Sequence, residues 1–201
     1  MKTTTALSRL ALAAVAAASL AAPVASQAAD GPWLVRARAV NLQASNGDTT
    51  GLGLSTNNKW LPEVDFTYFI NKNIAAELIL TVPQSQTLYS KGTAIGSFKH
   101  LPPTLTLQYH FDANGFKPYV GAGINYTRLS DINLPAGVSV DSNSFGPALQ
   151  VGVDIPVGKN LYVNFDVKKV YIRTDVSAAG SKLGTFKVDP LLVGVGLGWR
   201  F

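Results

Sequence analysis

Apolar and polar residues alternate along eight segments of the chain, each about ten residues long. In residues 62–70, for example, Val64, Phe66 and Tyr68 alternate with acidic residues and threonine. A period of two residues is typical of β-strands whose two faces meet different surroundings. The predicted strands are Pro32–Gln43, Pro62–Ile70, Ile74–Thr81, Lys99–Phe111, Lys117–Thr127, Ser144–Ile155, a segment that starts at Asn160, and Lys187–Phe201.

The links between these segments alternate in length. The second and third, fourth and fifth, and sixth and seventh segments are joined by about three to five residues, and the other links have about twelve to eighteen. This alternation is typical of outer-membrane barrels, which have short periplasmic turns and long outer loops. A tilted strand crosses a bilayer with about nine to eleven residues, which fits each segment.

Alternation alone would also fit a soluble β-sandwich or a lipocalin-like barrel. The large aromatic residues favour the membrane, because they lie at the strand ends nearest the short turns or the termini, where they would form a periplasmic girdle. They are Trp33, Tyr68, Tyr109, Phe111, Tyr119, Trp199 and Phe201. We therefore predict an all-β fold, an eight-stranded antiparallel transmembrane β-barrel in the outer membrane of a Gram-negative cell.

The first residues have the pattern of a cleavable signal peptide. Lys2 and Arg9 precede an apolar run, 10–22, that is short for a transmembrane helix, and Ser26 and Ala28 stand at the spacing of a signal-peptidase site. We predict a signal peptide at 1–28, secretion to the periplasm, and a barrel domain at 29–201.

Composition excludes several kinds of site. The chain has no cysteine, which excludes a disulfide framework and a cysteine-based metal site. The net charge of +5 is small and scattered, which argues against a nucleic-acid partner. The two histidines, His100 and His110, have no serine at two residues' distance and no metal-ligand spacing. We predict no enzyme activity, no catalytic residue, no cofactor and no metal.

Several strands resemble those of the OmpW family. The most specific piece is Lys99-His100-Leu101-Pro102-Pro103-Thr104-Leu105, followed by Gln108-Tyr109-His110-Phe111. Residues 117–126, 144–152 and 188–201 also resemble strands of this family. The similarity extends over nearly the whole chain after the predicted signal peptide and is weakest in the outer loops.

The resemblance implies a narrow, mainly hydrophobic channel for passive uptake of small hydrophobic molecules, a role shared by the related alkane-uptake barrels. A solute would enter from the outer loops and leave sideways through the wall. The resemblance also implies that the terminal Phe201 is the signal read by the outer-membrane assembly machinery. The expected partners are outer-membrane lipids, this machinery and a small hydrophobic solute, and the barrel is expected to be a monomer.

The predicted inward face carries charges of both signs. An eight-stranded barrel has room for its own side chains or one small ligand, and charges there must pair or stay wet. We predict a plug of Arg36, Arg38, Glu63, Asp65, Glu77, Asp166 and Lys168. Such pairs could block a straight path and force a lateral exit, or they could only stabilise the lumen.

The outer loops contain apolar residues that water-exposed loops usually avoid. We predict a hydrophobic mouth lined by Leu52, Leu54, Trp60 and Phe98. Alternatively, loop residues pack on one another in strands and short helices beyond the membrane. Two functions therefore stay open at this point. One is the channel, and the other is a structural or receptor barrel whose loops bind phage, toxin or host molecules without transport.

Overall fold

A computed structural model describes residues 31–201, and the predicted signal peptide lies outside the described residues. Eight antiparallel strands form a closed barrel, as predicted, because β9 pairs with β11 at the end of the sheet order. These strands are β1 (Trp33–Gln43), β4 (Lys59–Phe69), β5 (Ile74–Thr81), β8 (Thr104–His110), β9 (Lys117–Asn133), β11 (Asn143–Pro156), β12 (Leu161–Val170) and β15 (Leu191–Arg200). No helix in the described range is long and apolar enough to cross a membrane.

The outward face of the barrel is apolar. On β8 the outward Leu107 is 57% exposed, whereas the inward Thr106 is 2% exposed. A soluble β-protein shows the opposite arrangement, because water then covers the polar face. The exposed leucine, valine and phenylalanine side chains of the barrel strands therefore face lipid.

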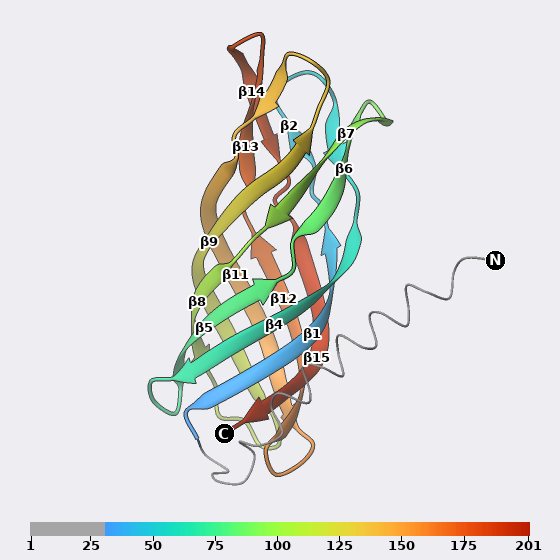
Figure 1. Cartoon of the computed structure of the whole chain (residues 1–201). Helices are drawn as coiled ribbons and strands as arrows, with labels where there is room; N and C mark the ends of the chain where they lie inside the picture. The colour runs from blue at the N-terminus through green and yellow to red at the C-terminus, as the bar shows by residue number, and fades with distance from the viewer. Residues whose placement is uncertain (1–30) are drawn as a thin grey trace, which may run out of the picture.

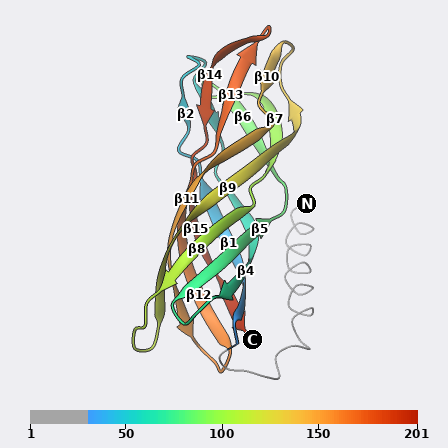
Figure 2. The same cartoon turned by 90° about the vertical axis from the view of Figure 1, so that its left-hand side faces the viewer.

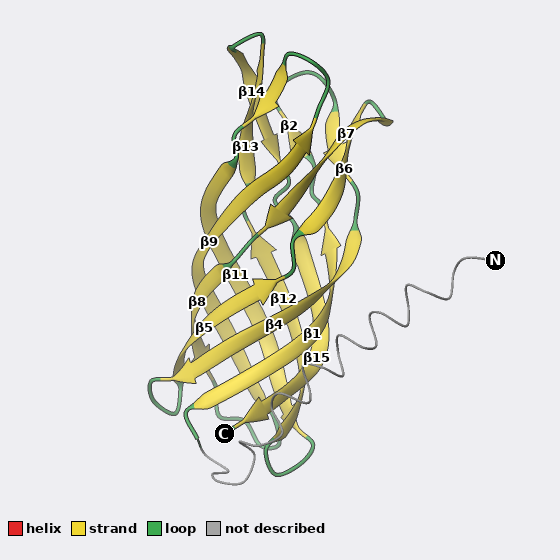
Figure 3. Cartoon of the chain, in the orientation of Figure 1, coloured by secondary structure: helices red, strands yellow, loops and turns green. Residues whose placement is uncertain are grey.

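Seven further strands extend the wall beyond the barrel, at the end opposite the described chain ends (Figures 1 and 2). They are β2 (Gly47–Asp48), β3 (Leu54–Thr56), β6 (Gln84–Ser90), β7 (Thr93–Leu101), β10 (Val138–Val140), β13 (Arg173–Ala178) and β14 (Ser181–Lys187). The long links, expected as loops, thus contain strands (Figure 3): β6 with β7 and β13 with β14 form hairpins, and β2, β3 and β10 pair with strands of other links. We call this part the outer extension.

Two predicted strands differ from the structure because of proline. The predicted segment Lys99–Phe111 is divided into β7 and β8 by Pro102 and Pro103, which have no N–H for a ladder. The last barrel strand begins at Leu191, after Pro190, and not at Lys187. Residues 181–187 instead form β14 of the outer extension.

The periplasmic end carries exposed aromatic residues, with one correction. The Trp33 and Tyr68 rings lie 4.9 Å apart, as do those of Tyr109 and Phe111. Tyr119 does not belong to this girdle, because its side chain points into the lumen and is 1% exposed.

Candidate functional site

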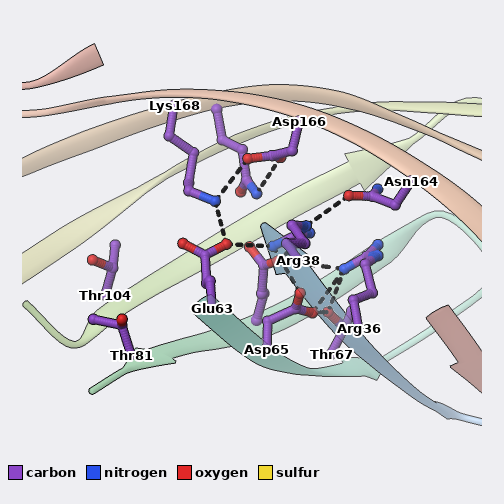
Figure 4. Close-up of polar contacts among 12 residues, drawn as sticks. Arg36, Arg38, Glu63, Asp65, Thr67, Thr81, Thr104, Asn164, Asp166 and Lys168 are labelled. Carbon is purple, nitrogen blue, oxygen red and sulfur yellow. Dashed lines mark hydrogen bonds and ion pairs between the residues drawn. The ribbon is translucent and has the colours of Figure 1, made fainter. Parts of the chain in front are cut away.

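The periplasmic half of the lumen is filled by a network of buried charges around two arginines (Figure 4). Arg36 lies at 2.9 Å from Asp65, 2.7 Å from Asp154 and 3.3 Å from Glu77. Arg36 and Asp154 form a two-point contact, because Nε and Nη2 each donate to one carboxylate oxygen. Bidentate pairs of this kind fix both partners in one orientation.

Arg38 and Lys168 extend the network toward the outside of the cell. Arg38 contacts Glu63 at 2.9 Å, Asp65 at 2.7 Å and Glu77 at 3.2 Å. Lys168 contacts Glu63 at 2.6 Å and Asp166 at 2.7 Å. The structure thus brings all seven predicted plug residues together, and their functional role stays a prediction.

Neutral side chains that were not predicted for the plug complete the network. Tyr119 donates to Asp166 at 2.7 Å, and its ring lies under the Arg36 guanidinium, 5.1 Å from the ring centre. Gln108 donates to Glu77 at 2.8 Å, and Gln150 donates to Asp166 at 2.7 Å. The strand parity that Tyr119 shares with Gly121 and Gly123 could have placed it in the lumen. These bonds join the charges into a layer across the lumen that resists displacement, because breaking one pair leaves a buried charge.

Above this layer the lumen becomes apolar. A cavity of about 30 Å³, which we call the inner chamber, is lined by six aliphatic side chains and two prolines, together with Glu63 and Lys168 of the network and with Thr81, Thr104 and Asn125. The aliphatic residues are Leu42, Leu61, Ile79, Val170, Ile172 and Leu192. Small barrels usually have a polar interior, so this apolar section is unusual for the architecture.

A second apolar cavity, the outer chamber, lies inside the outer extension and has a volume of about 20 Å³. Its lining includes Leu54, Leu88, Phe98, His100, Leu129, Val176 and Phe186. Ile172 contributes to the lining of both chambers, which places them next to each other. Each cavity has room for one or two waters only, so a solute must displace side chains to pass.

The predicted mouth residues do not all come together. Leu54 and Phe98 are buried in the apolar cluster of the outer extension, and Leu52 packs against that cluster. Trp60 is a correction, because it is 64% exposed and shares the outward parity of Phe66 and Tyr68 on β4. Whether the other three residues act as a mouth stays a prediction.

The wall is interrupted beside the inner chamber. β5 and β8 pair as far as Ile79 and Thr104, and β6 and β7 pair from Gln84 and His100 onward. In the described chain, no ladder pair joins residues 80–83 to residues 101–103, and three of these positions are prolines, Pro83, Pro102 and Pro103. Thr81 and Thr104 border both this interruption and the inner chamber (Figure 4). We call the interruption the wall gap.

A closed eight-stranded barrel with an apolar outer face and a lumen filled by its own side chains defines the class of small outer-membrane β-barrels. The OmpW family model matches residues 29–201. The chain belongs to the OmpW family and is an outer-membrane protein.

Relatives match along most of their length. The chain is 42% identical to the uncharacterized outer-membrane protein y4mB of Sinorhizobium fredii, over 92% of this chain and 90% of the relative. It is 36% identical to the dibenzothiophene metabolism operon protein PahQ of Pseudomonas aeruginosa, over 68% of this chain and 69% of the relative. It is 34% identical to outer membrane protein W of Escherichia coli, over 97% of this chain and 100% of the relative.

Solved structures show the same architecture. The crystal structure of OprG from Pseudomonas aeruginosa has a TM-score of 0.73 and 25% identity, over 85% of this chain and 96% of OprG. The solution structure of outer membrane protein W from Escherichia coli has a TM-score of 0.66 and 31% identity, over 85% of this chain and 98% of that protein.

Proposed function

We propose that this barrel is a narrow channel for the passive uptake of small hydrophobic molecules across the outer membrane. A solute enters through the outer extension, passes the outer and inner chambers, and leaves sideways through the wall gap into the membrane. The observation that carries the proposal is that two features lie at the same height in the barrel. The apolar interior ends at the polar network, and the wall is interrupted beside the last apolar chamber.

The two halves of the lumen support this route energetically. An apolar solute can replace aliphatic contacts in the chambers at little cost, because such contacts have no fixed direction. It would lose that gain in the network, where it would have to separate paired charges. The neighbouring lipid is apolar as well, so a sideways exit keeps the solute in an apolar environment.

The relatives give independent support. PahQ is a protein of a dibenzothiophene metabolism operon, and dibenzothiophene is an apolar fused-ring compound. A relative encoded in such an operon supports a role of this barrel in admitting apolar compounds. The alternative, a receptor or structural barrel without transport, predicts no such uptake and is an outcome of the test below.

The first experiment measures uptake by intact cells, because the lipopolysaccharide leaflet is the barrier that hydrophobic solutes meet. A strain without the gene is complemented with the wild type or with Leu61→Asn, which puts an amide into the inner chamber. We expect the initial rate of p-xylene uptake to fall with Leu61→Asn to that of the deletion strain. Leu183→Ser, on the exposed β14 hairpin, is the control and should keep the wild-type rate. Equal uptake with and without the gene would overturn the channel and favour the alternative, a receptor or structural barrel without transport.

The second experiment tests the sideways exit. The triple variant Pro83→Val, Pro102→Val and Pro103→Val returns backbone donors to the wall gap, so that the ladder can close. We expect slower p-xylene uptake at an unchanged amount of protein in the membrane. Pro156→Val, at the periplasmic end of β11, is the matched control. If the triple variant admits p-xylene at the wild-type rate, the solute does not leave through the wall gap.

A further inference from the structure

The outer chamber contains one imidazole among apolar side chains. His100 lies on β7, is 1% exposed, and lines the chamber together with Phe98 and Leu129. Neither of its ring nitrogens, Nδ1 or Nε2, has a hydrogen-bond partner. Its contact with the Phe98 ring, edge to face at 6.2 Å, leaves both nitrogens without a partner.

A second buried polar group lies next to it. Gln86 on β6 is 1% exposed, its Oε1 accepts from the Thr56 hydroxyl at 3.3 Å, and its Nε2 has no partner. Gln84 pairs with His100 and Gln86 pairs with Phe98 across the β6–β7 ladder. His100 and Gln86 are therefore diagonal neighbours on the same inward face, a separation that long side chains can span together.

Unpartnered groups of this kind are uncommon in a folded protein. Nearly all buried polar atoms have a partner, because desolvation without a hydrogen bond is unfavourable. A leucine or phenylalanine at either position would fit the apolar cluster without that loss. In the polar network each carboxylate contacts a cation, and the atoms without a hydrogen bond there are single ones, Asp65 Oδ2, which lies 2.7 Å from Arg38, and His110 Nδ1. At the outer chamber, by contrast, both ring nitrogens of His100 and the neighbouring Gln86 Nε2 have no hydrogen-bond partner among the described residues.

The protonation state of His100 defines what it can bind. Burial, with a smaller contribution from the nearby positive charge of Lys59, lowers the pKa of His100 to about 4. The ring is neutral at pH 7, so one nitrogen donates and the other accepts. The Gln86 amide adds a donor. A hydroxyl group matches this set, because its oxygen accepts one bond while its hydrogen is donated.

We propose that His100, which lines the outer chamber, and its neighbour Gln86 form a polar subsite that binds the hydroxyl group of an otherwise apolar solute, such as a phenol. The hydroxyl oxygen accepts from the Gln86 amide, the hydroxyl hydrogen is donated to the imidazole, and the hydrocarbon part packs on Phe98 and Leu129. This inference rests on the proposed function and narrows its substrate class, from hydrophobic molecules in general to those with one hydrogen-bonding hydroxyl.

The test compares p-cresol with p-xylene, which differ only in a hydroxyl in place of a methyl group. Uptake by complemented cells is measured for both, and the deletion strain gives the background. We expect His100→Phe and Gln86→Met each to lower the p-cresol to p-xylene uptake ratio about two- to tenfold, the range of one hydrogen bond. His100→Phe removes two unpartnered nitrogens, and Gln86→Met removes the unpartnered Nε2 together with the Oε1 that accepts from Thr56 at 3.3 Å, so the barrel is expected to fold. His110→Phe, at the periplasmic side of the network, is the matched control and should keep the ratio.

A direct binding measurement accompanies the uptake assay. The chain has two histidines, so in protein labelled with ¹⁵N-histidine and placed in lipid nanodiscs, the single variants assign each imidazole signal. We expect p-cresol, but not p-xylene, to shift the His100 ring nitrogens and to leave those of His110 in place.

The outcomes separate the two proposals. If both solutes enter the cells but the ratio is unchanged by His100→Phe and p-cresol moves no ring signal, the subsite is overturned and the channel stands. If p-cresol shifts His100 while neither solute enters faster than in the deletion strain, the channel fails and the subsite stands.

Discussion

The two halves of the lumen are built from the same strands, and on several strands the change between them takes one inward step. On β1 the inward residues pass from Arg38 to Val40, and on β5 from Glu77 to Ile79. On β12 the change is from Lys168 to Val170. The inner face of the barrel therefore has a polar half and an apolar half on the same strands. The polar half depends on directed bonds that fix its shape, and the apolar half depends on contacts that can rearrange around a solute.

The largest expected effect of a single substitution lies in the polar half. Arg36→Met removes the cation that contacts Asp65, Asp154 and Glu77, and it leaves these carboxylates buried with fewer partners. We expect the free energy of unfolding to fall by about 3–5 kcal/mol. Urea unfolding of the barrel in lipid vesicles, followed by tryptophan fluorescence, measures this.

A charge-balanced variant provides the control for Arg36→Met. Adding Asp154→Leu removes the carboxylate with the two-point contact to Arg36. The double variant should recover part of the loss. If Arg36→Met alone is as stable as the wild type, the network does not stabilise the periplasmic half.

In the apolar half we expect a smaller loss of stability together with a gain of function. Ile172 is buried and lines both chambers. Ile172→Ala should lower the free energy of unfolding by about 2–4 kcal/mol through the lost contacts and the enlarged cavity. It should also raise the p-xylene uptake rate, because it joins the two chambers. If the variant is destabilised but uptake is unchanged or slower, the chambers do not form the rate-limiting passage.

Acid should weaken the outer half through His100. Its pKa is about 4 in the folded barrel and 6.5 as the ordinary value, so the unfolded chain binds the proton more readily. The stability contributed by the neutral ring is complete above pH 6.5 and is lost as the pH falls toward 4. We expect the free energy of unfolding of the wild type to fall by about 2 kcal/mol between pH 7 and pH 5, and we expect no such fall in His100→Phe. Parallel pH profiles for the two proteins would show that this ring is not buried in its neutral form.

The smallest effect is expected at the exposed surface. Lys99 and Asp131 form an ion pair at 2.7 Å, and their side chains are 47% and 66% exposed. Lys99→Met should change the free energy of unfolding by less than about 1 kcal/mol, because water and salt screen such pairs. A loss as large as that of Arg36→Met would mean that exposure does not separate the two kinds of ion pair in this barrel.

The barrel strands and the plug were predictable for one reason. Lipid on one side and a narrow lumen on the other impose a strict period of two, so β5 was predicted with its observed bounds, Ile74–Thr81. The parity of each strand then placed Arg36, Lys168 and the other plug residues on the inner face. The same parity, applied to β4 and β9, would have placed Trp60 outside and Tyr119 inside.

Other features depend on pairings that the sequence does not contain. The strands of the outer extension stand outside the lipid, so segments such as β6 have polar residues on both faces and lack the period that identified the barrel. The wall gap lies where residues 80–83, which include Pro83, and residues 101–103, which include Pro102 and Pro103, form no ladder pair, and this requires the pairing of β5 with β8 and of β6 with β7 to be known. The free nitrogens of His100 are visible only when every neighbour is in place.

The first and last barrel strands pair with each other, from Leu34 with Arg200 to Gln43 with Leu191. The backbone of Trp33 also exchanges two hydrogen bonds with that of Phe201. Until this seam forms, the sheet has two open edges that lipid cannot satisfy. The seam joins residues separated by most of the chain, and such contacts form slowly. Insertion into the bilayer therefore has to wait for the last barrel strand. A barrel that lacks this strand has two open edges and no stable form in the membrane.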